Sequence, residues 1–286
     1  MVISFLDTPN FYAEIVKLLN NNLSLIVSER NTYPFGFISF KKRLLEHLHR
    51  VADKIVVNSH YHRIILENKY NWITKKIQTI YNGVDLIRYS PQYKYTYKNN
   101  FLVIGSLKRQ KNPIGLINAI KIYRDKYYND IKINWAGRIN NISKEEYSLF
   151  SKATTLITKY GLEGNWNWLG ERSDIHTLLT DHDALILPSF FEGLPNAICE
   201  AFACGKPVLA SKVCEHPRII TEGKNGFLFD PNNPEDIADV IHKYNNLSIE
   251  LKDKMVYSAR DYAEDEFSNE KFVNLYELLV LDLVKG

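Results

Sequence analysis

Short apolar runs alternate with segments of helical hydrophobic period along almost the whole chain, and this alternation leaves few folds open. A fully buried parallel strand is a continuous apolar run, and the helix that crosses to the next strand has apolar residues three and four positions apart. Repeated units of this kind predict an α/β fold with parallel sheets. The chain has 286 residues, 45% of them hydrophobic, which is enough for one large or two ordinary domains.

The alternation forms two series on either side of a polar, tyrosine-rich stretch at 81–100, YNGVDLIRYSPQYKYTYKNN. An Asn-Gly turn and a proline within this stretch indicate a linker. The apolar runs before it predict strands at 2–6, 23–28, 54–58 and 76–81. The runs after it predict strands at 101–106, 131–137, 165–170, 183–189, 206–211 and 226–229. Helices are predicted from Pro113 and Pro195 and at 144–160, 234–246 and 268–284.

The two series predict two Rossmann-like doubly wound domains. We expect a partial N-terminal domain at 1–95 and a complete C-terminal domain at 96–265. Residues 266–286 are expected to form a helix that packs back toward the N-terminal domain. Because a strand begins almost at Met1, with no preceding unit to cover its edge, the N-terminal domain is expected to lack its first βα units.

Charge and cysteine usage exclude several classes of protein. The chain has 36 Lys and Arg residues against 33 Asp and Glu residues, so charge alone does not predict a nucleic-acid partner. No apolar run is long enough to span a membrane, and Met1 is not followed by a signal-peptide pattern, which predicts a cytoplasmic location. Cys199, Cys204 and Cys214 have no histidines at zinc spacing and are interpreted as reduced core thiols.

A basic turn follows the predicted strand at 101–106. It contains Ser106, Lys108, Arg109 and Lys111, directly before a helix whose N-cap would be Asn112. Cations beside a helix N-terminus make an anion site, and phosphate is the usual anion. A solvated basic loop is the alternative interpretation. The turn after NWNWLG supplies Glu171 and Arg172, which could flank a base or a ribose.

Two glutamates lie eight positions apart in the stretch FFEGLPNAICEAFACGKPVLAS. Glu192 is in a strand-to-helix turn, at the edge of an open α/β sheet where ligands bind, and Glu200 is inside the following helix. The candidate donor-binding turn is Gly193, Leu194, Pro195 and Asn196. All of these residues except the proline have a backbone N–H group that could hold phosphate oxygens. Glu200 would lie roughly 7–8 Å along the helix from Pro195 and could accept hydrogen bonds from two neighbouring ribose hydroxyls. A helix-dipole role for Glu192 and a solvent-facing Glu200 are the alternatives.

These motifs together resemble glycosyltransferase family 4, which are retaining enzymes of the GT-B fold. The resemblance covers nearly the whole chain in order, through ADKIVVNS, YNGVDLIRYSP, IGSLKRQKN, LGERSDI, the glutamate pair with EAFACGKPV, and GKNGFLF. It implies transfer of a sugar from a nucleotide-diphosphate sugar to a glycan or lipid-linked acceptor with retention of configuration, as in polysaccharide biosynthesis. The C-terminal domain would hold the donor and the N-terminal domain the acceptor.

The resemblance also implies residue roles. Lys111 corresponds to the diphosphate-binding lysine, Glu192 to the glutamate that faces the transferred sugar, and Glu200 to the glutamate that binds the ribose. Lys111 and Glu192 are therefore the candidate catalytic residues. No metal is expected, because Lys111, its basic neighbours and helix N-termini can stabilise the leaving diphosphate. Asp181 and Asp183 form a D-x-D metal motif of another fold, but at the amino end of a strand, away from the ligand edge.

The chain departs from the family pattern in three places. Ser106 stands where the family often has arginine, so Lys108 or Arg109 is a candidate for the missing cation. The strand edge where the family usually has a histidine reads SERN, and the candidate acceptor-side residues there are Glu29, Arg30 and Asn31. The family also begins with a glycine-rich loop and about 80–100 further residues, a length consistent with a full domain, and we expect this N-terminal segment to be absent here.

The third departure keeps other functions open. A non-catalytic donor-binding subunit, completed by a partner chain, is the first alternative, and a glycosidase with Glu192 and Glu200 as acid and base is the second.

A predicted helix at 39–54 has a basic start, Lys41, Lys42 and Arg43, and apolar residues at helical spacing. It is either a core-facing helix or a site of peripheral contact with anionic lipid at the inner face of the membrane.

Overall fold

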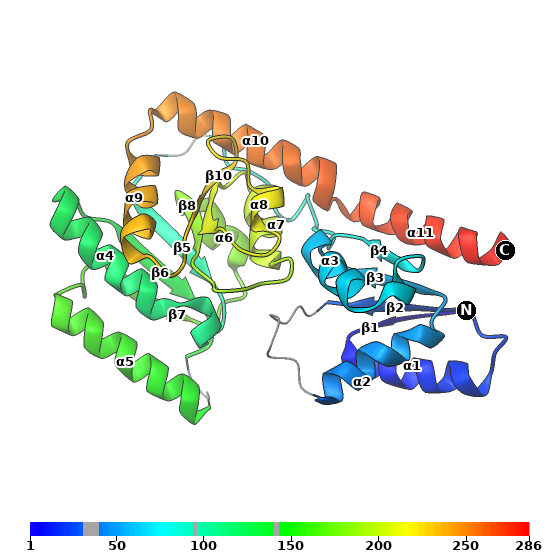
Figure 1. Cartoon of the computed structure of the whole chain (residues 1–286). Coiled ribbons are helices and arrows are strands. Elements are labelled where there is room, and N and C mark those ends of the chain that lie inside the picture. Colours follow the sequence, from blue (N-terminus) through cyan, green and yellow to red (C-terminus); the bar gives the residue numbers. More distant parts are fainter. Residues whose placement is uncertain (31–39, 94–95, 140–142, 286) are drawn as a thin grey trace. The chain divides into compact units, whose positions relative to one another are not determined.

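The structure is a computed structural model that describes residues 1–30, 40–93, 96–139 and 143–285, with the side chains of 40–42 and 285 outside the description. The chain divides into two compact units, each built on a parallel sheet (Figure 1). Unit 1 comprises Met1–Gly83, Glu192–Leu194 and Phe267–Gly286. Unit 2 comprises Val84–Phe191 and Pro195–Glu266. The predicted α/β class is confirmed.

Unit 1 contains a four-stranded parallel sheet in the order β1-β2-β3-β4. The strands are β1 (Val2–Phe5), β2 (Leu25–Glu29), β3 (Lys54–Val57) and β4 (Ile77–Thr79). The helices are α1 (Asp7–Leu19), α2 (Phe40–Leu48), α3 (His60–Lys69) and α11 (Asn269–Lys285), with short 3-10 turns η1 (His49–Val51) and η2 (Asn71–Ile73).

The two faces of this sheet bury alternate residues of the same strands. Leu25, Val27, Ile55 and Val57 pack on one face with Leu66 of α3. On the other face, Ile26 and Val56 pack with Tyr276 and Leu279 of α11. The last helix of the chain thus returns to complete the core of unit 1, because a parallel sheet needs cover on both faces.

Helix α1 has an unusual distribution of polarity. Its buried residues are Asn10, which donates from Nδ2 to the Ser28 carbonyl at 3.0 Å, and Glu14. Its outward face carries Tyr12, Val16 and Leu19, of which Leu19 is 84% exposed. Among the described residues, its neighbouring strand β1 pairs with β2 alone and is the edge of the sheet.

Unit 2 contains a six-stranded parallel sheet in the order β10-β9-β8-β5-β6-β7. The strands are β5 (Asn100–Ile104), β6 (Lys132–Ala136), β7 (Trp166–Gly170), β8 (Ala184–Leu187), β9 (Val208–Ser211) and β10 (Gly226–Phe229). The helices are α4 (Pro113–Tyr127), α5 (Lys144–Tyr160), α6 (Ile175–Thr180), α7 (Asn196–Ala203), α8 (His216–Ile219), α9 (Pro234–Asn245) and α10 (Ile249–Phe267). The order reverses between β5 and β8, and such a switch point is where doubly wound sheets bind ligands.

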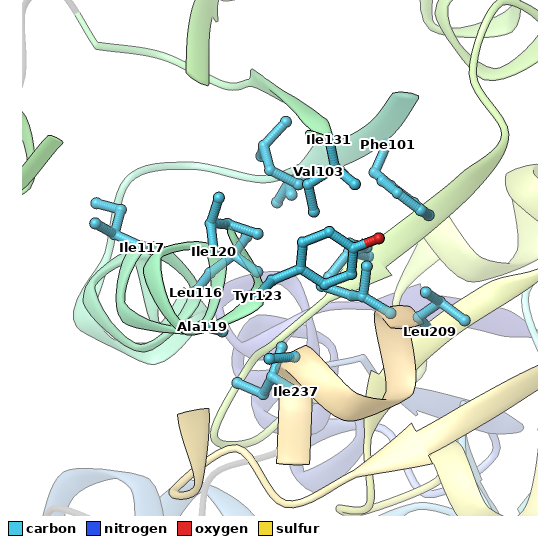
Figure 2. Close-up of a cluster of buried hydrophobic side chains, with 14 of the residues drawn as sticks. Phe101, Val103, Leu116, Ile117, Ala119, Ile120, Tyr123, Ile131, Leu209 and Ile237 are labelled. Atoms are coloured by element: carbon cyan, nitrogen blue, oxygen red, sulfur yellow. The ribbon is translucent and has the colours of Figure 1, made fainter. Parts of the chain in front are cut away.

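The core of unit 2 forms where helices α4 and α9 cover the sheet. Figure 2 shows Tyr123 of α4 among Phe101 and Val103 of β5, Leu209 of β9 and Ile237 of α9. The Tyr123 hydroxyl accepts a hydrogen bond from Asn245 at 2.9 Å, so that its buried oxygen is satisfied. This packing fixes the strands whose carboxyl ends carry the candidate site.

All ten predicted strands are present, but the organisation differs from the sequence analysis in two respects. The compact units divide after Gly83, so the stretch 84–99 belongs to unit 2 rather than to a linker. Arg260 holds this stretch by donating from Nη1 to the carbonyls of Leu86 and Tyr89, at 3.2 and 2.9 Å. Arg260 lies on α10, a helix that the sequence analysis did not predict. The buried stripe of α10 is narrow and rich in alanine, with Met255, Ala259, Ala263 and Phe267, and therefore gives a weak hydrophobic signal.

The cysteine interpretation holds for two of the three residues. Cys199 and Cys204 are buried free thiols, whereas Cys214 is partly exposed and has a left-handed backbone, with φ of 51°. None of the described helices has the length and apolar character needed to cross a bilayer.

Candidate active site

The turn after β5 is shaped by side chains that hold its backbone. Residues 105–112, named here the basic turn, include the short 3-10 helix η3 (Arg109–Lys111). Asn112 has a left-handed backbone, with φ of 53°, which asparagine tolerates. Its Oδ1 accepts from the Gly115 amide at 3.1 Å, and its Nδ2 donates to the Pro231 carbonyl at 2.8 Å. The predicted N-cap at Asn112 and helix start at Pro113 are confirmed.

Two glycines let Lys111 lie against the end of the sheet. A Cβ atom on Gly105 would come 2.9 Å from Cε of Lys111, so the lysine side chain runs over Gly105. A Cβ on Gly137, which follows β6, would come 1.9 Å from the Gly105 carbonyl oxygen. The same oxygen accepts from Trp135 Nε1 at 2.9 Å. The position of Lys111 is therefore set by the closely packed ends of β5 and β6.

The turn after β8 carries Glu192. Residues 188–195 are named here the Glu192 turn, and Glu192 is 8% exposed. Helix α7 begins at Asn196, and Pro195 precedes it with an extended backbone, ψ of 123°, rather than occupying the first helical position. The prediction was wrong by one residue, because a proline ring fits the N-cap conformation as well as the first turn. Leu194 is buried and Asn196 is exposed.

Gln110 joins these two turns, and the sequence analysis did not find it. Its Nε2 donates to the Phe191 carbonyl at 2.7 Å, and its backbone carbonyl accepts from the Phe190 amide at 2.8 Å. The basic turn and the Glu192 turn therefore meet at the switch point between β5 and β8. No sequence pattern marks Gln110, since its partners are about 80 positions away.

Glu200 on α7 is half-buried and hydrogen-bonded to the hydroxyl of Tyr89. Burial raises the pKa of the Glu200 carboxyl, and the Tyr89 hydrogen bond and the charge of Arg88 oppose that rise. The Tyr89 ring makes an edge contact with His176, at 6.2 Å between centroids. Arg260 holds the Tyr89 backbone and also donates to the Ala203 carbonyl, at 2.8 Å, where α7 ends. Tyr89 and Arg260 are further residues that the sequence analysis missed.

The other cationic candidates have acidic partners nearby. Arg109 Nε lies 3.4 Å from Oε1 of Glu145 on α5, and both side chains are exposed. Arg172 donates from Nε to Asp174 at 2.7 Å and also from Nη2. Its hydrogen bonds lower the pKa of Asp174.

The remaining candidate residues of the donor side are described by their location and exposure. Ser106 is half-buried in the basic turn, Lys108 is exposed there, and Gly193 is half-buried in the Glu192 turn. Glu171 is exposed beside Arg172, in the turn after β7. The structure therefore brings Ser106 and Lys108 together with Lys111 in one turn.

Two acceptor-side candidates lie at the end of β2 in unit 1. Glu29 is buried and its Oε1 lies 2.9 Å from Nε2 of His49. Arg30 packs over the rings of Phe5 and Phe272 and donates from Nη2 to Tyr276 at 2.9 Å, which ties β2 to α11. Asn31 lies outside the described residues. An acceptor-side role for Glu29 and Arg30 stays a prediction.

The aspartates of the D-x-D motif have structural partners. Asp183 is buried just before β8 and accepts from the amides of Lys98 and Asn100, at 3.1 and 3.3 Å. Asp181 ends helix α6. Within the described part of the chain, no group of three His, Cys, Asp or Glu side chains is arranged to hold a metal ion.

Comparison with known proteins places this site in a family. The family model "Glycosyl transferases group 1" matches residues 90–262, which contain the basic turn, the Glu192 turn and Glu200. An uncharacterised 41.2 kDa protein of the Klebsiella pneumoniae cps region is 23% identical over 276 residues, covering 91% of this chain and 72% of that protein. The N-acetyl-alpha-D-glucosaminyl L-malate synthase of Bacillus anthracis is 25% identical over 216 residues, and the match spans only 55% of that enzyme.

The solved structures extend the likeness to both units. The crystal structure of Anabaena Alr3699/HepE in complex with UDP and glucose matches with a TM-score of 0.84 at 20% sequence identity, over 99% of this chain and 78% of that one. A glycosyltransferase from Rickettsia africae also matches with a TM-score of 0.84. These likenesses show the GT-B fold. Since the family model covers more than half of the sequence, the chain belongs to the glycosyl transferases group 1 family.

Proposed function

We propose that this protein is a retaining glycosyltransferase of family 4 type that moves a sugar from a nucleotide-diphosphate sugar to a glycan or lipid-linked acceptor, as in polysaccharide biosynthesis. The observation that carries the proposal is the contact between Gln110 of the basic turn and Phe191, next to Glu192, at the switch point of unit 2. A diphosphate needs fixed cations and amides, and the basic turn supplies both beside the N-terminus of α4.

We assign the candidate residues the following roles, of which those of Lys111 and Glu200 are supported by their contacts. Lys111 binds the diphosphate from its fixed place over Gly105. Glu200 accepts hydrogen bonds from the ribose hydroxyls, and Tyr89 orients its carboxylate. Glu192 faces the transferred sugar, and the amides of Gly193, Leu194 and Asn196 contact phosphate oxygens. Ser106, Lys108, Arg109 and Arg172 line the donor side.

The chemical step follows from these roles. As the bond between sugar and diphosphate breaks, negative charge builds on the leaving phosphate, where Lys111 and the amides stabilise it without a metal. The acceptor attacks the face that the nucleotide leaves, and a phosphate oxygen of the donor takes its proton, so that configuration is retained. UDP-sugars are the first donors to test, because the Anabaena neighbour was solved in complex with UDP and glucose.

The proposal is tested by calorimetric binding of UDP-, GDP- and ADP-sugars, together with donor hydrolysis and NMR of the anomeric configuration of the product. Lys111→Ala and Glu200→Ala are each expected to weaken binding of one donor by about tenfold or more, since a lost charge-assisted hydrogen bond corresponds to about 1.5–3 kcal/mol. Lys121→Ala and Glu250→Ala are the matched controls, because both residues are exposed in i,i+4 ion pairs. Wild-type protein that binds no donor, or site variants that bind like the controls, would contradict the proposal.

Two predictions about partners remain, contact with anionic lipid and binding of a partner chain. Arg43 and Leu44 of α2 are exposed, whereas Leu45 and Leu48 are partly buried against the unit. The side chains of Lys41 and Lys42 lie outside the described residues. The outward face of α1 is the apolar surface on which a partner chain would bind. Liposome flotation tests the first prediction and co-purification tests the second.

A further inference from the structure

Gln110 makes the contact between the two turns that carry Lys111 and Glu192. Its side-chain amide donates to the Phe191 carbonyl at 2.7 Å, and the Phe190 amide donates to its backbone carbonyl at 2.8 Å. Phe191 directly precedes Glu192, and Gln110 directly precedes Lys111. The residues next to the two candidate catalytic residues are thus hydrogen-bonded to each other.

The Glu192 turn lies between two regular elements of unit 2. The ladder of β8 ends at Leu187 and helix α7 begins at Asn196, so the intervening residues lie outside both regular elements. The basic turn is held by several further contacts, because Asn112 ties it to Gly115 and Pro231, and Trp135 holds Gly105. Gln110 therefore links this held basic turn to the start of the Glu192 turn.

We propose that Gln110 is a positioning residue, which holds Phe190 and Phe191, the residues directly before Glu192, against the basic turn that carries Lys111. This inference rests on the proposed function for its consequence in catalysis. The side chain of Gln110 acts through Phe191 rather than through the substrate. Because the reacting groups of an enzyme tolerate little displacement, a small shift of the Glu192 turn slows the reaction.

The first experiment measures the coupling without any substrate. Gln110→Met keeps the length and neutrality of the side chain but removes its donor. We expect backbone amides of 188–195 to exchange hydrogen about fivefold faster in this variant than in wild type, as the loss of one neutral hydrogen bond predicts. Gln92→Ala, at an exposed glutamine outside both turns, is the control and should exchange like wild type. Equal exchange in Gln110→Met and wild type would overturn the proposal.

The second experiment separates positioning from folding. In Gln110→Met, kcat is expected to fall about tenfold, while KM for the donor, the Kd for the free nucleoside diphosphate and the Tm stay close to wild type. This split arises because Lys111 and Glu200, which hold the nucleotide, remain in place. Unchanged kcat would overturn the proposal, and so would a parallel fall of Tm and nucleotide affinity, since that pattern marks a general loss of structure.

The failure of the proposed function would be recognised separately. If wild-type protein turns over no nucleotide sugar, the proposed function fails, and the exchange experiment alone decides the role of Gln110. Faster exchange in Gln110→Met then supports a fixed junction of the two turns, and equal exchange rejects it.

Discussion

A buried histidine, His49, bridges two buried carboxylates in unit 1. Its Nδ1 lies 2.5 Å from Oε1 of Glu14 on α1, and its Nε2 lies 2.9 Å from Oε1 of Glu29 at the end of β2. All three side chains are 1% exposed. Burial by itself disfavours the imidazolium, but the hydrogen bonds and charges of the two glutamates raise the pKa of His49 to about 9. The charged histidine is therefore part of the folded core.

This arrangement predicts a pH-dependent stability. A histidine whose pKa is higher in the folded state stabilises the protein fully below its unfolded pKa of about 6.5, and the stabilisation is lost as the pH rises through about 9. At about 1.36 kcal/mol for each pKa unit, the difference corresponds to about 3 kcal/mol. Urea unfolding of unit 1 between pH 6.5 and 9.5 should show a fall of that order in the free energy of unfolding.

The matched variant is Glu14→Gln, which removes one carboxylate and keeps the shape. It should be less stable than wild type at pH 6.5 and should lose less stability on going to pH 9.5. Identical pH profiles in wild type and Glu14→Gln would contradict this role for His49.

Residues of the candidate site differ in how well the sequence predicts them. Lys111, Glu192 and Glu200 belong to motifs with local causes, a turn before a helix and a carboxylate on the helix that follows. Gln110 and Tyr89 act on residues about 80 and 110 positions away, and no local pattern encodes such contacts. The sequence therefore predicts the groups that would touch the ligand, and the structure adds those that hold them.

Between elements, the candidate site depends on how closely the ends of β5 and β6 approach. Gly137 follows β6, and a Cβ added there would come 1.9 Å from the Gly105 carbonyl oxygen, which is a backbone atom and cannot move alone. The side chain of Lys111 also runs close to Gly105, where a Cβ atom would come 2.9 Å from its Cε. Glycine is thus required at position 137 because there is no space for a Cβ atom between the strand ends, and not because of an unusual backbone conformation.

Gly137→Ala is therefore expected to destabilise unit 2 by about 2–3 kcal/mol or more, as overpacking of a rigid site does. It should also weaken nucleotide binding, because the displaced Gly105 carries Lys111 with it. Gly164→Ala is the matched control, since no atom lies within 4 Å of a Cβ built there. Its expected effect is near zero or a small stabilisation. Thermal unfolding and calorimetry of both variants check the prediction, which fails if the two behave alike.

Two helices show why element-level prediction has limits. Helix α1 places Asn10 and Glu14 inside and Val16 and Leu19 outside, so its hydrophobic period indicates the wrong inner face. Helix α10 buries a narrow stripe that includes Ala259 and Ala263, which contribute little hydrophobicity. Strands were predicted better, because both faces of a parallel strand are buried and each strand is therefore a continuous apolar run.

For the whole molecule, the division into two units means that each has a core of its own. The core of unit 1 joins Ile26 and Val56 to Tyr276 and Leu279, so α11 is part of this core. The core of unit 2 joins α4 and α9 to its own sheet, as around Tyr123 and Ile237 (Figure 2). Proteins with separate cores do not generally unfold in one step.

Calorimetric unfolding of the full chain should thus resolve two transitions that respond to different variants. Leu279→Ala is expected to lower the transition of unit 1 and Ile237→Ala that of unit 2, each by about 2–5 kcal/mol, the usual cost of such a buried cavity. A bound nucleoside diphosphate at about 100 times its Kd should raise the transition of unit 2 by about 2.7 kcal/mol. Lys111→Ala should abolish that rise without moving the transition of unit 1. A single transition that every variant shifts would contradict independent unfolding of the two units. A ligand stabilises only the folded structure that binds it. A nucleotide that raises the transition of unit 1 alone would therefore contradict a donor site in unit 2.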